Sequence, residues 1–94
     1  MKYGIRAACV LVRRYINHYH LTTPAQIISR WAPRTENDTS NYVRIACGHA
    51  QLSPDTPITY TDKATVCRLL AGMILVECGQ PIDPVIIEQG YDIA

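Results

Sequence analysis

Apolar positions recur at three- and four-residue steps through most of the chain, which is the spacing of an amphipathic helix. Residues 3–19 show it first, with an apolar stripe made of Ile5, Ala8, Cys9, Val12, Tyr15, Ile16 and Tyr19. Residues 62–78 show it again, with one side made of Val66, Leu69, Leu70, Met73, Ile74 and Glu77. Thr61 or Asp62 can cap the second stretch, and Gly79 and Pro81 follow it, as is common after a helix. We predict a long helix over each.

Two cap-and-proline signals predict shorter helices. Thr23 is a favourable N-cap, Pro24 suits the first helical position, and Gln26 completes a capping box. This helix should stop at Ala32, because the residue before a proline is pushed out of the helical region. Asp83 and the proline after it mark the start of a second short helix near the end of the sequence.

A polar run, Glu36-Asn37-Asp38-Thr39, offers several caps for another helix, whose apolar positions are Tyr42, Val43, Ala46, Cys47 and Ala50. Residues 52–60 contain two prolines and are typical of an ordered loop. Sustained strand-like alternation is absent. The predicted fold is therefore all-α, a compact single domain over residues 1–94 that forms a bundle of about five helices, two of them short.

Composition narrows the possible partners. Apolar residues make up 48% of the chain and charged residues 18%, which is typical of a globular protein. The net charge of +1 argues against a dedicated binder of duplex DNA. The longest apolar run, Leu69 to Val76, is less than half of the roughly 20 residues that a membrane helix needs, and no secretory signal is visible. We therefore expect no nucleic-acid partner, no membrane partner, and a cytoplasmic protein or a component of an assembly.

The cysteines and histidines indicate no metal or cofactor. Most of Cys9, Cys47, Cys67 and Cys78 fall in apolar helical patterns, which favours buried free thiols over two disulfides. A zinc site could use Cys47 and His49 with His18 and His20, but the spacing matches none of the usual zinc patterns. Cys47 could also pair with His18 or His20 as a nucleophile, yet no oxyanion loop or glycine-rich elbow accompanies it. No phosphate-binding glycine loop or dinucleotide fingerprint is present.

The acidic residues offer two catalytic hypotheses. Glu36 and Asp38, with Asn37 between them, could form a carboxylate pair near Trp31 suited to sugar cleavage. Capping and turn formation are favoured instead, because sequence neighbours on one loop rarely flank a bond from opposite sides. Glu77 ends an apolar stripe, where burial would raise the pKa of its carboxyl and suit it to general acid catalysis.

Glu77 also has a simpler interpretation, in which it reaches solvent or pairs with Arg30 or Arg44. Seven arginines outnumber two lysines, and six Tyr accompany the single Trp31. This inventory suits a protein–protein hot spot, because Arg, Trp and Tyr dominate such surfaces. A solvated helix face with charge pairs four residues apart explains the arginines equally well.

One stretch of the chain resembles a known family. It contains Tyr15, the segment Ile27-Ile28-Ser29-Arg30-Trp31-Ala32-Pro33, the run Glu36-Asn37-Asp38-Thr39, and Tyr42-Val43. These motifs resemble a family of small phage and prophage proteins, usually labelled virion or structural proteins. Glu77-x-Gly79-x-Pro81 and the final Gly90 and Ile93 are similar to that family as well, although Cys78 stands where the family has Asn and Ile82 replaces an aromatic residue.

The resemblance implies a structural or accessory protein, cytoplasmic or virion-associated, rather than an enzyme. The expected partner is a virion or host protein, bound through the region from Trp31 to Tyr42 without a cofactor. The residues expected to bind are Arg30, Trp31, Glu36, Asn37, Asp38 and Tyr42. The alternative is a peptidoglycan-active or peptidoglycan-binding module in which Glu77 is the acid, Glu36 or Asp38 the second carboxylate, and Trp31 a sugar platform.

Overall fold

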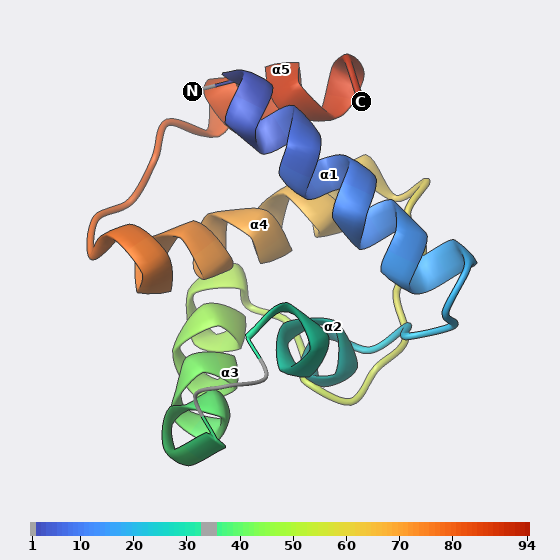
Figure 1. Ribbon diagram of the computed structural model, residues 1–94. Coiled ribbons are helices and arrows are strands. Elements are labelled where there is room, and N and C mark those ends of the chain that lie inside the picture. Colours follow the sequence, from blue (N-terminus) through green and yellow to red (C-terminus); the bar gives the residue numbers. More distant parts are fainter. Residues whose placement is uncertain (1, 33–35) are drawn as a thin grey trace.

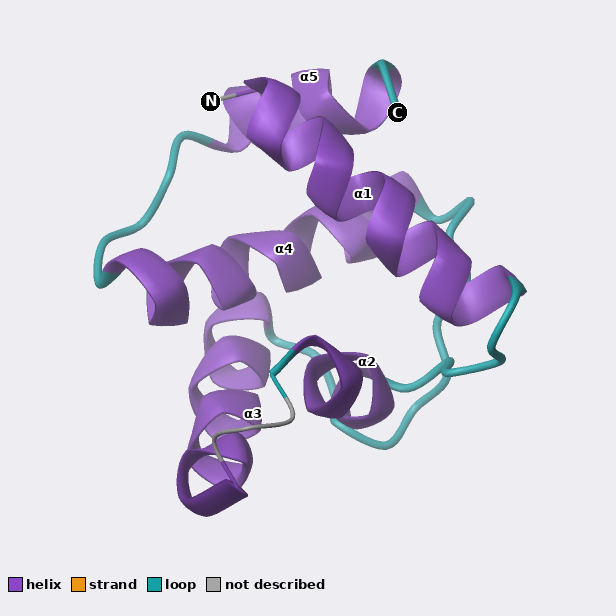
Figure 2. Ribbon diagram, in the orientation of Figure 1, coloured by secondary structure: helices purple, strands orange, loops and turns teal. Residues whose placement is uncertain are grey.

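The computed structural model describes residues 2–32 and 36–94, with side chains described from Gly4 to Ala32 and from Thr39 onward. Five helices occupy most of this length (Figures 1 and 2): α1 (Lys2–Asn17), α2 (Pro24–Trp31), α3 (Glu36–Ala50), α4 (Lys63–Cys78) and α5 (Pro84–Asp92). The described residues contain no strand. The predicted all-α bundle of five helices, two of them short, is confirmed.

Three helices begin at the predicted caps. The Thr23 hydroxyl accepts a hydrogen bond from the Gln26 N–H at 3.2 Å, and the Gln26 side chain accepts one from the Thr23 N–H at 3.3 Å, so the predicted capping box of α2 is present. Asp62 caps α4 by accepting from the Thr65 N–H at 3.3 Å. At α5 the cap is the Asp83 carboxylate. Each cap satisfies a backbone N–H that the first turn of a helix leaves without a partner.

Two predicted boundaries were wrong. The first helix ends at Asn17 rather than at residue 19, because the N–H groups of His18 and Tyr19 both turn back to the Arg14 carbonyl and His20 takes a positive φ of 57°. The polar run that begins at Glu36 was expected to cap the third helix from outside. It belongs to the helix instead, because α3 already begins at Glu36. Pro33, expected to fix the exit from α2, lies outside the described residues.

The helices pack around one core. α1 lies beside α5, while α4 crosses beneath them and packs against both α5 and α3 (Figure 1). α2 packs against α1 and α3. The largest fully buried side chains come from all helices but α3, and include Val12, Ile27, Ile28, Leu69, Leu70, Met73 and Ile87.

The α3–α4 contact depends on one glycine. A Cβ at Gly72 would overlap the Ala46 carbonyl oxygen and would lie 2.9 Å from the Ala46 carbonyl carbon. Gly72 therefore lets the two backbones approach more closely than any other residue would allow. This approach sets the distance between α3 and the second half of α4.

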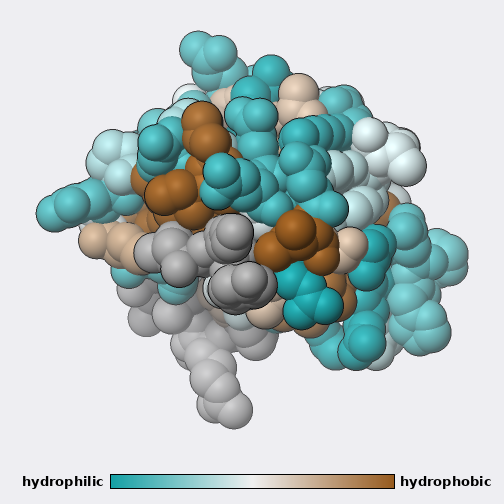
Figure 3. All heavy atoms as spheres, turned by 90° about the horizontal axis from the view of Figure 1, so that it is seen from above, coloured by the Kyte–Doolittle hydropathy of each residue, from teal (hydrophilic) through white to brown (hydrophobic). Residues whose placement is uncertain are grey.

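Seen from above, the molecule is mostly hydrophilic and its apolar side chains gather in separate patches (Figure 3). The exposed large apolar residues among the described ones are Tyr19, Val85 and Ile93. None of the described helices combines the length and the apolar character needed to traverse a bilayer.

Candidate functional site

An open cleft forms where the end of α2, the middle of α3 and the end of α4 meet. Its volume is about 590 Å³, within the usual range for ligand sites. Its lining consists of Trp31, Ala32, Asn41, Tyr42, Ile45, Val76 and Glu77. The structure thus brings together Trp31 and Tyr42, the two aromatic residues expected to bind, with Glu77, which the sequence had grouped with Trp31 only in the peptidoglycan alternative.

The α2–α3 corner of this cleft is held by local hydrogen bonds. The Ala32 N–H donates to the Ile28 carbonyl at 2.9 Å, which closes α2. The Thr39 hydroxyl donates to the Ala32 carbonyl at 3.3 Å, which connects the first turns of α3 to the end of α2. These bonds fix the direction in which Trp31 leaves α2, so its ring lies partly on the core and partly in the cleft.

Tyr42 anchors the floor of the cleft. Its side chain is 7% exposed, and its hydroxyl donates to the Met73 carbonyl on α4 at 3.3 Å. Burial and the negative charge of Glu77 both raise the pKa of Tyr42, and an interaction with Trp31 partly opposes them. Tyr42 is therefore a neutral, fixed aromatic side chain that feels the Glu77 charge.

Glu77 reaches solvent at the mouth of the cleft. Neither partner proposed for it from the sequence pairs with it. Arg30 places its guanidinium over the Tyr19 ring, 5.4 Å from the ring centre. Arg44 donates to the Asn41 side-chain oxygen at 2.5 Å. Within the described part of the chain, Glu77 forms no ion pair.

The remaining predicted site residues are not part of the described lining of this cleft. Arg30, expected to bind, turns toward Tyr19 instead. Glu36, Asn37 and Asp38 belong to the first turn of α3, but their side chains lie outside the described residues. A second carboxylate beside Glu77, which the catalytic alternative needs, is therefore not placed.

The thiols and imidazoles do not converge. All four cysteines are free, with Cys9 and Cys47 buried and Cys78 exposed. His18, His20 and His49 are exposed. Burial raises the pKa of the Cys47 thiol, and the charge of Asp55 adds to this, which makes Cys47 a poor nucleophile. Among the described side chains, no group of three or more His, Cys, Asp and Glu could hold a metal ion.

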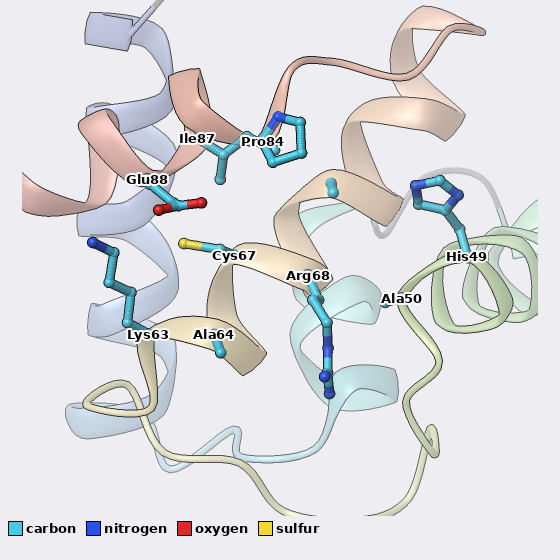
Figure 4. A pocket seen from close by; sticks show the side chains of 10 residues that line it. His49, Ala50, Lys63, Ala64, Cys67, Arg68, Pro84, Ile87 and Glu88 are labelled. Atoms are coloured by element: carbon cyan, nitrogen blue, oxygen red, sulfur yellow. The ribbon is translucent and has the colours of Figure 1, made fainter.

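Sequence reasoning missed a second cavity, of about 620 Å³, bordered by α4, α5 and the end of α3. Figure 4 shows Cys67 of α4 pointing toward Ile87 and Glu88 of α5, with His49 on the opposite side. Its floor on α4 is made of small side chains, namely Ala64, Cys67 and Ala71. Small residues on a helix give no sequence signal of their own, so this groove follows only from the α4–α5 packing.

The charged groups around this second cavity largely compensate one another. Lys63 forms an ion pair with Asp92 at 2.8 Å, and Glu88 lies close enough to help raise the pKa of Lys63, although the Asp92 hydrogen bond is the main cause. Cys67 is half-buried, and burial raises its pKa to about 11. The thiol is thus protonated at neutral pH.

The fold and the cleft define a small helical protein with an open cleft whose lining includes aromatic, aliphatic and acidic side chains. The chain is similar to Protein P5 of Pseudoalteromonas phage PM2, with 32% identity over 77 residues that cover 82% of this chain and 46% of P5. The chain thus spans about half the length of this curated relative. No protein-family model matches the chain, and no solved structure matches it. The similarity to P5 supports a phage-related protein.

Proposed function

We propose that this phage-related chain is a structural or accessory protein that binds another protein through the cleft formed by Trp31, Tyr42 and Glu77. The supporting observation is that this corner is held by two side-chain hydrogen bonds. The Thr39 hydroxyl of α3 donates to the Ala32 carbonyl at the end of α2, and the Tyr42 hydroxyl donates to the Met73 carbonyl of α4. A surface fixed before binding loses little conformational entropy when the partner arrives. No cofactor is required, and the location is the virion or the cytoplasm.

The residue types suit such contacts. Trp and Tyr provide large rigid surfaces at interface centres, and one side of Trp31 remains open to the cleft. The partner is expected to be a virion or host protein. Trp31 would supply most of the buried apolar area, while Tyr42, anchored in the core, would shape the floor.

Photo-crosslinking tests this proposal. A p-benzoylphenylalanine is placed at Asn41, an exposed residue on the rim of the cleft, and at Ser53 as a matched control on the 52–60 loop. Both proteins are expressed in cells producing the phage or prophage, and crosslinked products are identified by mass spectrometry. We expect a defined phage or host protein linked at Asn41 and not at Ser53. Equal labelling at both positions, or none at Asn41, would contradict the proposal.

Peptidoglycan is the second candidate partner. The juxtaposition of an indole ring, an amide and a carboxylate favours it, because aromatic platforms and polar side chains of this kind suit sugars. Hydrolysis would need Glu77 as the acid and a second carboxylate, with Glu36 and Asp38 as the candidates.

Turbidity of a peptidoglycan suspension distinguishes hydrolysis from binding. A loss of turbidity that Glu77→Gln abolishes would support the enzymatic alternative and overturn a purely structural role. Sedimentation of the protein with peptidoglycan, without turbidity loss, would support binding alone. Neither effect is expected if the partner is a protein.

A further inference from the structure

We infer that the Trp31–Tyr42–Glu77 cleft accepts a cationic side chain, arginine or lysine, presented by the partner protein. This inference rests on the proposed function and specifies the chemistry of the partner. In this inference Glu77 is the counter-ion of the partner's cation. Within the described residues, Glu77 forms no ion pair.

The charge distribution in the cleft supports this assignment. Glu77 is the one charged residue in the described lining. The two partners expected for Glu77 from the sequence do not pair with it, since Arg30 stacks on Tyr19 and Arg44 binds the Asn41 side chain at the rim of the cleft. Apart from the Asn41 amide, the described walls beside Glu77 are aromatic and aliphatic, and such walls concentrate the field of a carboxylate at the mouth of a cleft.

The position of Glu77 on its helix points the same way. It lies one residue before the end of α4, where the helix dipole is already negative, and the last turn of α4 contains no basic residue. Only one of the terminal carbonyls, that of Leu75, is seen to accept a capping bond, from the Gly79 N–H at 2.8 Å. A carboxylate here is locally unfavourable, and an incoming cation would relieve both its charge and that of the helix end.

The aromatic side chains add a second attraction. A guanidinium or ammonium group over the face of a Trp or Tyr ring is stabilised by the ring quadrupole, and Trp is the strongest of these. Trp31 is only partly buried and shares the lining with Glu77. The same chain already uses this contact internally, in the stacking of Arg30 on Tyr19.

Trp31 is the only tryptophan, so its fluorescence reports on the cleft alone. The probe is the blocked tripeptide acetyl-Gly-Arg-Gly-amide, with acetyl-Gly-Gln-Gly-amide as the neutral control. We expect the arginine peptide to change Trp31 emission saturably and the glutamine peptide not to do so. Added salt should weaken the binding, because part of it is a charge interaction near the surface.

Two matched variants identify the acceptor. Glu77→Gln and Glu88→Gln each remove one exposed carboxylate, the second on α5 at the other cavity. We expect Glu77→Gln to weaken the affinity for the arginine peptide about 2- to 10-fold and Glu88→Gln to leave this affinity unchanged. The range of about 2- to 10-fold corresponds to the loss of one exposed charge pair and of part of a cation–π site. Circular dichroism checks that both variants remain folded.

The outcomes separate this inference from the proposed function. Equal binding of the arginine and glutamine peptides, or equal effects of the two variants, would overturn the inference. So would a response to tri-N-acetylchitotriose without one to the arginine peptide, which would favour the peptidoglycan candidate. If Glu77→Gln leaves the crosslinking yield at Asn41 undiminished, the proposed binding of a protein partner is retained. The inference that Glu77 binds a cationic side chain of that partner is then contradicted. If crosslinking at Asn41 fails in the native chain, the proposed function itself fails.

Discussion

Gly72→Ala tests the packing that forms the cleft. The added methyl group would overlap the Ala46 carbonyl oxygen and approach the Ala46 Cα to 3.0 Å. Backbone atoms cannot rotate away as a side chain would, so we assign the upper part of the range of about 1–3 kcal/mol that overpacking costs. Alanine in a helix gains about 1 kcal/mol over glycine. The expected result is a net loss of about 1–2 kcal/mol in the free energy of unfolding.

Urea unfolding followed by circular dichroism measures this change. Gly48→Ala is the matched control, because Gly48 lies on the exposed side of α3 and a Cβ there meets nothing within 4 Å. The control should stabilise the protein by up to about 1 kcal/mol. If Gly72→Ala is as stable as Gly48→Ala, the close approach of α3 and α4 does not exist, and the placement of Glu77 beside Tyr42 loses its basis.

Three further predictions follow from local interactions. Asp83→Ala should lower the free energy of unfolding by about 1 kcal/mol, measured by urea unfolding, while Asp83→Asn retains most of the cap. At pH 8, iodoacetamide should modify Cys67 about 100-fold more slowly than a thiol of pKa 9.0, because a pKa of about 11 leaves a hundredfold less thiolate, as peptide mapping can show. The free energy of unfolding should fall as the pH rises above 9, because the Cys and Tyr side chains ionise at lower pH in the unfolded chain than in the folded one. A free energy of unfolding that stays constant from pH 7 to 10 would contradict the raised pKa values of Cys9, Cys47, Tyr42 and Tyr60.

The sequence predicted those parts of the fold that depend on neighbouring residues. The start of α2 is determined within four residues by Thr23 and Gln26, and the end of α4 by Gly79, which adopts a φ of 73°. The end of α1 was misjudged because the apolar stripe includes Tyr19, which is 48% exposed and stacks with Arg30 outside the helix. A stripe in the sequence does not distinguish a core residue from a surface aromatic one.

The candidate site was predictable only in part. Trp31 and Tyr42 lie on either side of one corner, so their proximity could be anticipated from the α2 stop and the α3 start. The addition of Glu77 depends on how α4 crosses α3, and that crossing depends on Gly72, which has no local signature. The direction of the Arg30 side chain could not be predicted from the sequence either, because it depends on the position of Tyr19, which follows the end of α1.

The most direct test of the central claim is the indole N–H resonance of Trp31, which gives a single peak in a ¹⁵N spectrum because the chain has one Trp. The crosslinked partner, once identified, is titrated into labelled protein. We predict that this peak shifts or broadens together with the backbone peaks of Asn41 and Val76, whereas Val85 and Ile93 on the α5 side stay unchanged. Shifts confined to the α5 side, with the indole peak unmoved, would show that the partner binds elsewhere.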